Sequence, residues 1–248
     1  MTKKRKLSKI MYLHYCKLFY RSSLFIIATI LYIYNHVKNT GLTFGGLENK
    51  PIIMGIIWLV YVVEMALRFF PSSWESMGCQ KQFSKNYHPT ETPAEEAKIL
   101  PAFRTFIVLA VWIALNGAIG LLYHFHIIDG GILLLISLAY SVCDLICILF
   151  FCPFQTWFMK NRCCATCRIY NWDFAMMFTP LIFLNNLYAK SLVILSLGLL
   201  VKWEYNLHRY PERFCEATNS SISCKECPEK LCHQKSQLKH FWKKQKIW

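Results

Sequence analysis

The sequence predicts an all-α, polytopic integral membrane protein, a helical bundle of six transmembrane helices whose last two form a hairpin. Two observations predict this fold class. Of the 248 residues, 55% are hydrophobic and only 17% are charged. The hydrophobic residues also gather into runs of about 20, the number that a helix needs to cross a hydrocarbon core of about 30 Å. This composition excludes a disordered chain and disfavours an ordinary soluble domain.

Four apolar runs have the length of single spans. They cover residues 18–37, 51–70, 102–123 and 130–151. Basic residues precede the first run and no small-residue cleavage site follows it, so we interpret it as an uncleaved signal anchor. The expected organisation is a basic cytoplasmic N-terminus at 1–17, a membrane bundle at 18–206 and a basic, Cys-rich cytoplasmic tail at 207–248.

The last apolar stretch, residues 170–203, is too long for one ordinary span. Asn185, Asn186 and Lys190 interrupt it near the middle, where a lipid-facing helix would have to bury them at a cost. Two interpretations follow. The stretch is either one long tilted helix, which gives five spans, or a hairpin of two shorter helices, which gives six.

The distribution of Lys and Arg favours the hairpin, because these residues concentrate in short cytoplasmic loops. With six spans both termini are cytoplasmic, and 25 of the 28 Lys and Arg residues lie inside. With five spans the tail lies outside and the division becomes 15 to 13. We therefore predict six spans in the cell (inner) membrane, with the turn at 185–189 on the outer side.

None of the 12 cysteines falls in a predicted outer loop. Disulfides persist in oxidising compartments, so a disulfide-stabilised extracellular protein would have the opposite distribution. Eight of the cysteines lie in two cytoplasmic Cys-rich segments, the loop at 152–174 and the tail. We therefore expect reduced thiolates that hold a metal or carry redox chemistry.

The spacing of four of these cysteines is typical of a metal site. Cys164 and Cys167 form one Cys-x-x-Cys unit, and Cys224 and Cys227 form another. Two sulfurs at this spacing can bind one ion, so these four residues are the predicted metal ligands. Six spans bring both units to the same side of the membrane, whereas five spans separate them. Four thiolates suit either zinc or iron.

The surplus of cysteines favours an iron–sulfur cluster, with zinc as the alternative. The other cysteines of the two segments are predicted to bind the cofactor as well: Cys152, Cys163, Cys215 and Cys232. Eight cysteines are the number that two cubane clusters require, and a cysteine followed by proline recurs in cluster-binding runs, although the spacing here is not that of bacterial ferredoxins. Redox-active or acylated thiols, and cysteines that only pack, are the other interpretations.

The loop between the fourth and fifth spans contains further polar candidates. Arg168 is expected to donate to cluster sulfurs or to a lipid phosphate. Asn171 or Asp173 is expected to cap the fifth helix, and Trp172 to lie in the interfacial aromatic belt. Pro180 is expected to kink that helix.

Two acidic residues, Glu64 and Asp144, lie within predicted spans, where a charge is a functional candidate. Arg68 follows Glu64 by four residues, which predicts an ion pair along one helix. Asp144 has no such local partner, which indicates either a cation from another helix or a proton or ion pathway. Cys143 and Cys147 beside it are interpreted as packing residues.

The leading functional expectation is electron transfer or redox sensing at the inner face, with a cytoplasmic redox partner. The alternative is a membrane transport or assembly protein in which a structural zinc joins loop and tail. Residues 235–248 mix Lys with aromatic residues and are expected to lie on anionic inner-leaflet lipid. Orientation and lipid contact thus explain the net charge of +14 without nucleic acid. No phosphate-binding loop or hydrolase motif indicates an enzyme class.

Overall fold

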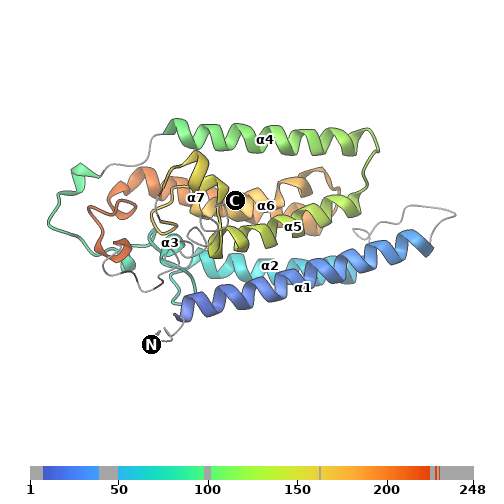
Figure 1. The fold of residues 1–248 in the computed structure, drawn as a ribbon, viewed down its shortest axis with the longest axis horizontal. Coiled ribbons are helices and arrows are strands. Elements are labelled where there is room, and N and C mark those ends of the chain that lie inside the picture. The colour runs from blue at the N-terminus through green and yellow to red at the C-terminus, as the bar shows by residue number, and fades with distance from the viewer. Residues whose placement is uncertain are drawn as a thin grey trace, which may run out of the picture.

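The computed structural model describes residues 8–38, 50–97, 102–161 and 163–223, together with residues 227 and 229. These residues form helices joined by turns, and no β-strand is found among them. The long helices lie side by side along the axis of an elongated molecule (Figure 1). The predicted all-α class is confirmed.

Four of the described helices are long and apolar enough to cross a membrane. They lie where the sequence predicts the first four spans: α1 (Lys9–Lys38), α2 (Pro51–Phe69), α4 (Ala102–His124) and α5 (Gly130–Leu149). Their boundaries agree with the prediction to within two residues, except that α1 begins nine residues earlier than expected. We therefore treat the chain as a membrane protein.

The outer faces of these helices carry large, exposed apolar side chains. Ile30 of α1 is 59% exposed, Leu59 of α2 57% and Ile113 of α4 60%. An apolar surface of this extent is a liability in water but is solvated by lipid tails in a bilayer. The exposed faces are therefore the lipid-contacting surface of the bundle.

Local chemistry explains where the helices begin. Pro51 occupies the first turn of α2, where its missing N–H would have no partner inside the helix. The Asp129 carboxylate accepts a hydrogen bond from Ile132 N (2.8 Å) and caps α5. Asn186 caps the last helix, α7 (Leu187–Arg209), through Tyr188 N (2.9 Å).

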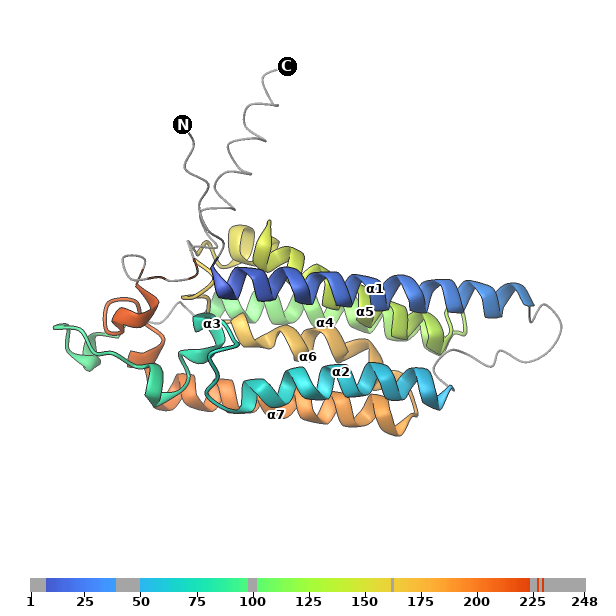
Figure 2. The same ribbon diagram turned by 90° about the horizontal axis from the view of Figure 1, so that it is seen from below.

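The last apolar stretch is divided. A 3₁₀ turn, η5 (Tyr170–Trp172), leads into α6 (Asp173–Phe178), and the chain continues as a second 3₁₀ segment, η6 (Thr179–Phe183), before α7 returns alongside α2 (Figure 2). The helix changes to 3₁₀ at Thr179 because Pro180 cannot supply an α-helical N–H. The arm at 173–183 is about half as long as an ordinary span, so the six-span count stays a prediction.

The connecting segments gather at one end of the bundle, which we call the loop end (Figure 1). It carries residues 70–97, 150–172 and 210–223, with these short elements: α3 (Met77–Gln80), η2 (Ser84–Asn86), η3 (Ala94–Glu96), η4 (Phe154–Phe158), η7 (Pro211–Arg213) and η8 (Ser220–Ile222). Ser220 N donates to His88 O (2.9 Å), which ties the segment after α7 to the loop after α2. The opposite or far end carries the short turns at 125–129 and 184–186.

The main hydrophobic core joins α1, α2, α5, α6, η6 and α7. Helix α4 lies at its edge and packs on η6 and η4. Gly120 allows this approach, because a Cβ atom there would lie 2.2 Å from the Phe183 ring. Helix α4 therefore covers the core from one side.

Candidate functional site

A buried ion network lies where α1, α2 and α5 meet. The Arg21 side chain is fully buried, and its Nη2 lies 2.5 Å from Glu64 Oε2. Its Nη1 lies 3.4 Å from Asp144 Oδ2 and donates to Ser141 O at 3.0 Å. The Tyr20 hydroxyl donates to Glu64 as well. One guanidinium from α1 thus neutralises carboxylates from two other helices.

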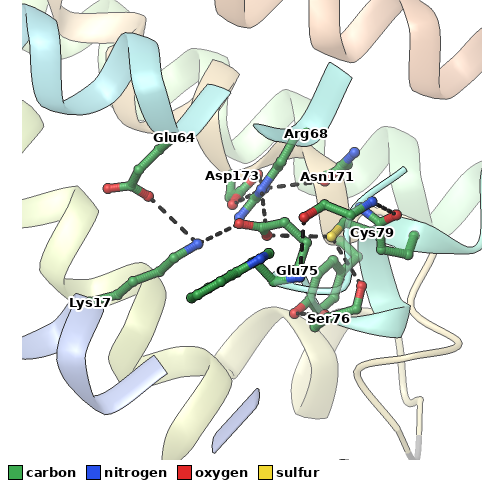
Figure 3. Close-up of polar contacts among 12 residues, drawn as sticks. Lys17, Glu64, Arg68, Glu75, Ser76, Cys79, Asn171 and Asp173 are labelled. Atoms are coloured by element: carbon green, nitrogen blue, oxygen red, sulfur yellow. Dashed lines mark hydrogen bonds and ion pairs between the residues drawn. The ribbon is translucent and has the colours of Figure 1, made fainter. Parts of the chain in front are cut away.

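The network continues toward the loop end (Figure 3). Lys17 Nζ donates to Glu75 Oε1 at 2.5 Å. Arg68 lies 3.4 Å from Glu75 and donates to both carboxylate oxygens of Asp173, at 2.6 and 2.5 Å. It also donates to Asn171 Oδ1 at 3.1 Å. Burial alone would raise the pKa of Glu75, but Arg68 and Lys17 hold that pKa below its usual value.

The network contains fewer cationic groups than carboxyl groups. Among the described residues it contains three cations and four carboxylates: Lys17, Arg21 and Arg68 against Glu64, Glu75, Asp144 and Asp173. Asp144 makes the longest of the Arg21 contacts and is also the carboxylate of α5 that lines a cavity. Asp144, whose nearest cation is more distant than that of the other three carboxylates, therefore lies beside that cavity.

The expected ion pair between Glu64 and Arg68 is not formed. The two side chains bind different partners, Arg21 for Glu64 and Asp173 for Arg68, because each faces a different neighbouring helix. For Asp144, Arg21 supplies the cation from another helix that one of the two interpretations required.

The cavity has a volume of about 290 Å³ and lies between α4, α5, α6 and the loop segments at 152–155 and 164–170. Its walls are mostly apolar, and aromatic and Met side chains from three helices line it: Trp112, Tyr140, Met176 and Met177. Five cysteines line it as well: Cys143, Cys147, Cys152, Cys164 and Cys167. Among the described residues, this is where the structure concentrates thiols next to buried charge.

A tight turn presents the first Cys-x-x-Cys unit to the cavity. Cys167 N donates to Cys164 O at 3.0 Å, which closes a β-turn over these four residues. Cys164 Sγ contacts Gln155 Oε1 at 3.2 Å, and Gln155 N donates to Cys152 Sγ at 3.3 Å. Gln155 thus connects the turn to Cys152, which also lines the cavity.

A buried lysine holds this turn from behind. Lys81 Nζ donates to Ala165 O at 2.7 Å and to Cys167 O at 3.0 Å. It lies over the ring of Trp203, 5.2 Å from the centroid. Burial lowers the pKa of Lys81 to about 8, although the neighbouring cysteines partly offset this. Burial and the nearby Cys164 raise the pKa of Cys167 to about 12, so this thiol keeps its proton at neutral pH.

The other predicted cofactor residues lie elsewhere. Cys163 is buried within the loop, where its Sγ accepts from Ala165 N (3.4 Å), and Cys215 lies in the segment after α7. Neither lines the cavity. Arg168 pairs with Glu204 of α7 at 3.1 Å. Two further candidates, Cys224 and Cys232, lie outside the described residues.

The fit of a metal to the described residues is incomplete. Cys164 and Cys167 offer two sulfurs, and Cys227 in the tail is half-buried. Within the part of the chain that the structure describes, no group of three or more His, Cys, Asp or Glu residues is arranged to hold a metal ion. The four-cysteine site predicted from the sequence also includes Cys224, which is not among the described residues.

Three minor expectations are corrected. Cys143 is exposed and lines the cavity with Cys147, so these cysteines are not buried packing residues. Asp173 does not cap α6, which begins without a side-chain cap, because the carboxylate is engaged by Arg68. Trp172 is buried and its Nε1 donates to Glu204 (2.8 Å), so it is not an interfacial anchor.

Sequence reasoning missed the cations of the site, Lys17, Arg21 and Lys81. Hydropathy starts the first span at residue 18, which leaves Lys17 in the aqueous N-terminus, and the count of inner basic residues includes Arg21 with that N-terminus although it lies inside the span. Their four-residue spacing puts them on one face of a helix that begins earlier, and this spacing was the available signal. Nothing in the sequence marks Lys81 as buried.

Comparisons with models of protein families, with curated proteins and with solved structures find no match for this chain.

Proposed function

We propose that this chain is a membrane protein that transfers electrons or senses redox state at the inner face of the cell membrane, through thiols of its Cys-rich loop. In this proposal the arm at 173–183 and α7 complete six membrane segments, and both termini are cytoplasmic. The distribution of Lys and Arg supports this orientation. Among the described residues, the connecting segments at 70–97, 150–161, 163–172 and 210–223 gather at one end of the bundle, which supports it too.

The observation that carries the proposal is the Cys164–Cys167 turn on the wall of an apolar cavity. The ends of a β-turn lie within about 7 Å of each other, and disulfides join residues whose Cα atoms are about 4.4–6.8 Å apart. The two cysteines can therefore form a disulfide with little backbone movement. Oxidation breaks two S–H bonds, forms one S–S bond and releases two electrons and two protons.

The groups around the turn suit this reaction. Lys81 places a positive charge behind the turn, which favours the thiolate that forms during exchange. Asp144 adds a carboxylate on the cavity wall that can receive the proton that a cysteine thiol loses on oxidation. Asp144 thus lines the same cavity as the reacting sulfurs, and Lys81 binds the carbonyls of their turn.

A Cys-ligated metal centre is the second candidate, with iron–sulfur favoured over zinc. It is supported by contact between tail and loop end: Glu229 accepts from Met77 N, and its carbonyl accepts from Ser8 Oγ at 3.3 Å. Cys227, the last residue of the second Cys-x-x-Cys unit, lies two residues before Glu229 and so near the same end of the bundle as the first unit. If the metal is zinc, it is a structural ion that joins the loop to the tail, and the protein acts in membrane transport or in the assembly of partners.

Anaerobic purification followed by redox titration separates these candidates. The protein is equilibrated in thiol–disulfide buffers of graded potential, thiols are trapped by alkylation, and metals and acid-labile sulfide are measured. We expect a reversible two-electron transition that is lost in Cys164→Ser and kept in Cys16→Ser, a cysteine outside the cavity. Stoichiometric iron and sulfide, together with visible absorbance, would show that the redox centre is an iron–sulfur cluster and not the dithiol. Stoichiometric zinc with no redox transition would overturn the redox function.

A reporter fused after Trp248 tests the topology. Cytoplasmic activity is the expected result. A reporter outside the cell would contradict six spans and would place the loop and the tail on opposite faces of the membrane.

A further inference from the structure

The cavity limits which oxidant or reductant can reach the Cys164–Cys167 turn. Its volume of about 290 Å³ is at the small end of ligand sites, which typically range from about 300 to 1,000 Å³. A single ring system fits this space, whereas a peptide or a second protein's active-site loop does not. Its apolar walls also disfavour a charged, water-soluble electron carrier.

The walls supply aromatic and polarisable contacts for a flat ring. Trp112 contacts Tyr140 and Phe154, and these three rings line the cavity together with the flexible thioethers of Met176 and Met177. Trp112 is held in place, since its Nε1 donates to Thr179 Oγ1 at 3.1 Å and its ring lies 4.8 Å from that of Tyr140. The cavity is therefore a preformed slot rather than a loose surface.

The cavity also reaches the lipid-facing surface. Cys143 of α5 lines it and is exposed, and it lies inside a helix apolar enough to cross a membrane. An exposed side chain at this position faces the hydrocarbon region, so a ligand can enter from the bilayer. The cavity therefore combines an opening toward lipid with thiols on its inner wall.

We propose that this cavity binds the ring of a membrane quinone, which exchanges two electrons with Cys164 and Cys167. This rests on the proposed dithiol function. In the oxidising direction the two S–H bonds break, the S–S bond forms, and the quinone takes up two electrons and two protons to become the quinol. In the other direction the quinol reduces the disulfide. Asp144 holds the proton in transit between sulfur and ring oxygen.

Purified protein in lipid nanodiscs is reduced, freed of reductant and mixed with ubiquinone carrying one isoprenoid unit. All ring carbons of this probe are substituted, so a thiol cannot add to the ring. We expect loss of quinone absorbance together with loss of two alkylatable thiols per chain. Met176→Trp fills the slot and should slow this reaction about tenfold or more. Ile194→Trp, on the exposed face of α7, should leave the rate within about twofold.

Diamide, a water-soluble thiol oxidant, separates failure of this inference from failure of the dithiol function. If diamide forms the Cys164–Cys167 disulfide but the quinone neither oxidises the thiols nor binds, the quinone site is wrong and the dithiol stands. If neither reagent forms the disulfide, the dithiol function fails and the quinone site fails with it.

Binding is tested without redox chemistry in the Cys164→Ser/Cys167→Ser variant. There the quinone should quench tryptophan fluorescence, and Trp112→Phe should remove most of that quenching. Quenching that is equal with and without Trp112 would overturn the site, even where Met176→Trp does not fold.

Discussion

The two ends of the bundle use polar side chains in different ways. At the far end they cap helices or face the surroundings: Asp129 caps α5, Asn186 caps α7, and Lys190 is exposed beside Asn185. At the loop end they are buried and converge from four helices on Arg21 and Arg68. Capping stabilises a helix locally, whereas a buried network fixes how helices are placed relative to one another. The loop end is therefore the part of the molecule in which buried charged side chains hold the helices in fixed relative positions.

Removing the central cation should have the largest effect. Arg21→Met removes the ion-pair partner of Asp144 and leaves buried Glu64 with only the more distant Lys17, at 4.0 Å, so we expect unfolding free energy to fall by about 3–5 kcal/mol. Denaturant unfolding in detergent, followed by tryptophan fluorescence, measures the change. Lys190→Met at the exposed far end should stay within about 0.5 kcal/mol of the parent. Equal effects of the two substitutions would show that the ends do not differ.

The lysine behind the Cys-x-x-Cys turn should have the next effect. Lys81→Met leaves the buried carbonyls of Ala165 and Cys167 without their donor, which should cost about 2–3 kcal/mol. The turn should loosen, and maleimide should label Cys167 about tenfold faster. Lys85→Met, an exposed lysine at the same end, is the matched control. Unchanged labelling in Lys81→Met would mean that the turn holds its shape without the lysine.

The contact of Glu229 with the loop end should depend on pH. Burial, reinforced by Glu75, raises the pKa of Glu229 from 4.5 to about 7, although the N–H of Met77 counteracts the shift. The folded state then binds the proton more tightly than the unfolded state, so this contribution is present below pH 4.5 and is lost as pH rises to about 7. Relative to Glu229→Gln, the parent should lose about 3 kcal/mol across this window. Parallel pH–stability curves would contradict the raised pKa.

The smallest effect should come from the far end. Asp129→Ala removes the cap of α5 and the acceptor for the Tyr32 hydroxyl, and should cost about 1 kcal/mol. The thiols of the cavity should react at their parent rates. A change in thiol trapping at Cys164 would indicate that the two ends are coupled through α5.

Hydropathy was sufficient for the four apolar helices because span length is a property of one continuous segment. It failed at the start of α1, since Lys17 and Arg21 look like residues of an aqueous tail until their partners on α2 and α5 are known. The i, i+4 spacing of Glu64 and Arg68 predicted the wrong ion pair for the same reason. Glu64 pairs with Arg21, 43 residues away, and Arg68 pairs with Asp173, 105 residues away. Cysteine spacing found the Cys164–Cys167 turn, but the cavity depends on how three helices pack and is not encoded in any short segment.

The long separation of the Arg21 partners also sets an order for assembly during synthesis. Asp144 follows Arg21 by 123 residues, whereas Glu64 follows it by 43. While α1 is the only helix made, its guanidinium has neither carboxylate and must stay near the aqueous boundary. Its neutralisation begins when α2 arrives and is completed by α5. We therefore expect the first helix to reach its final position only after α5, and so more than half of the chain, has been synthesised.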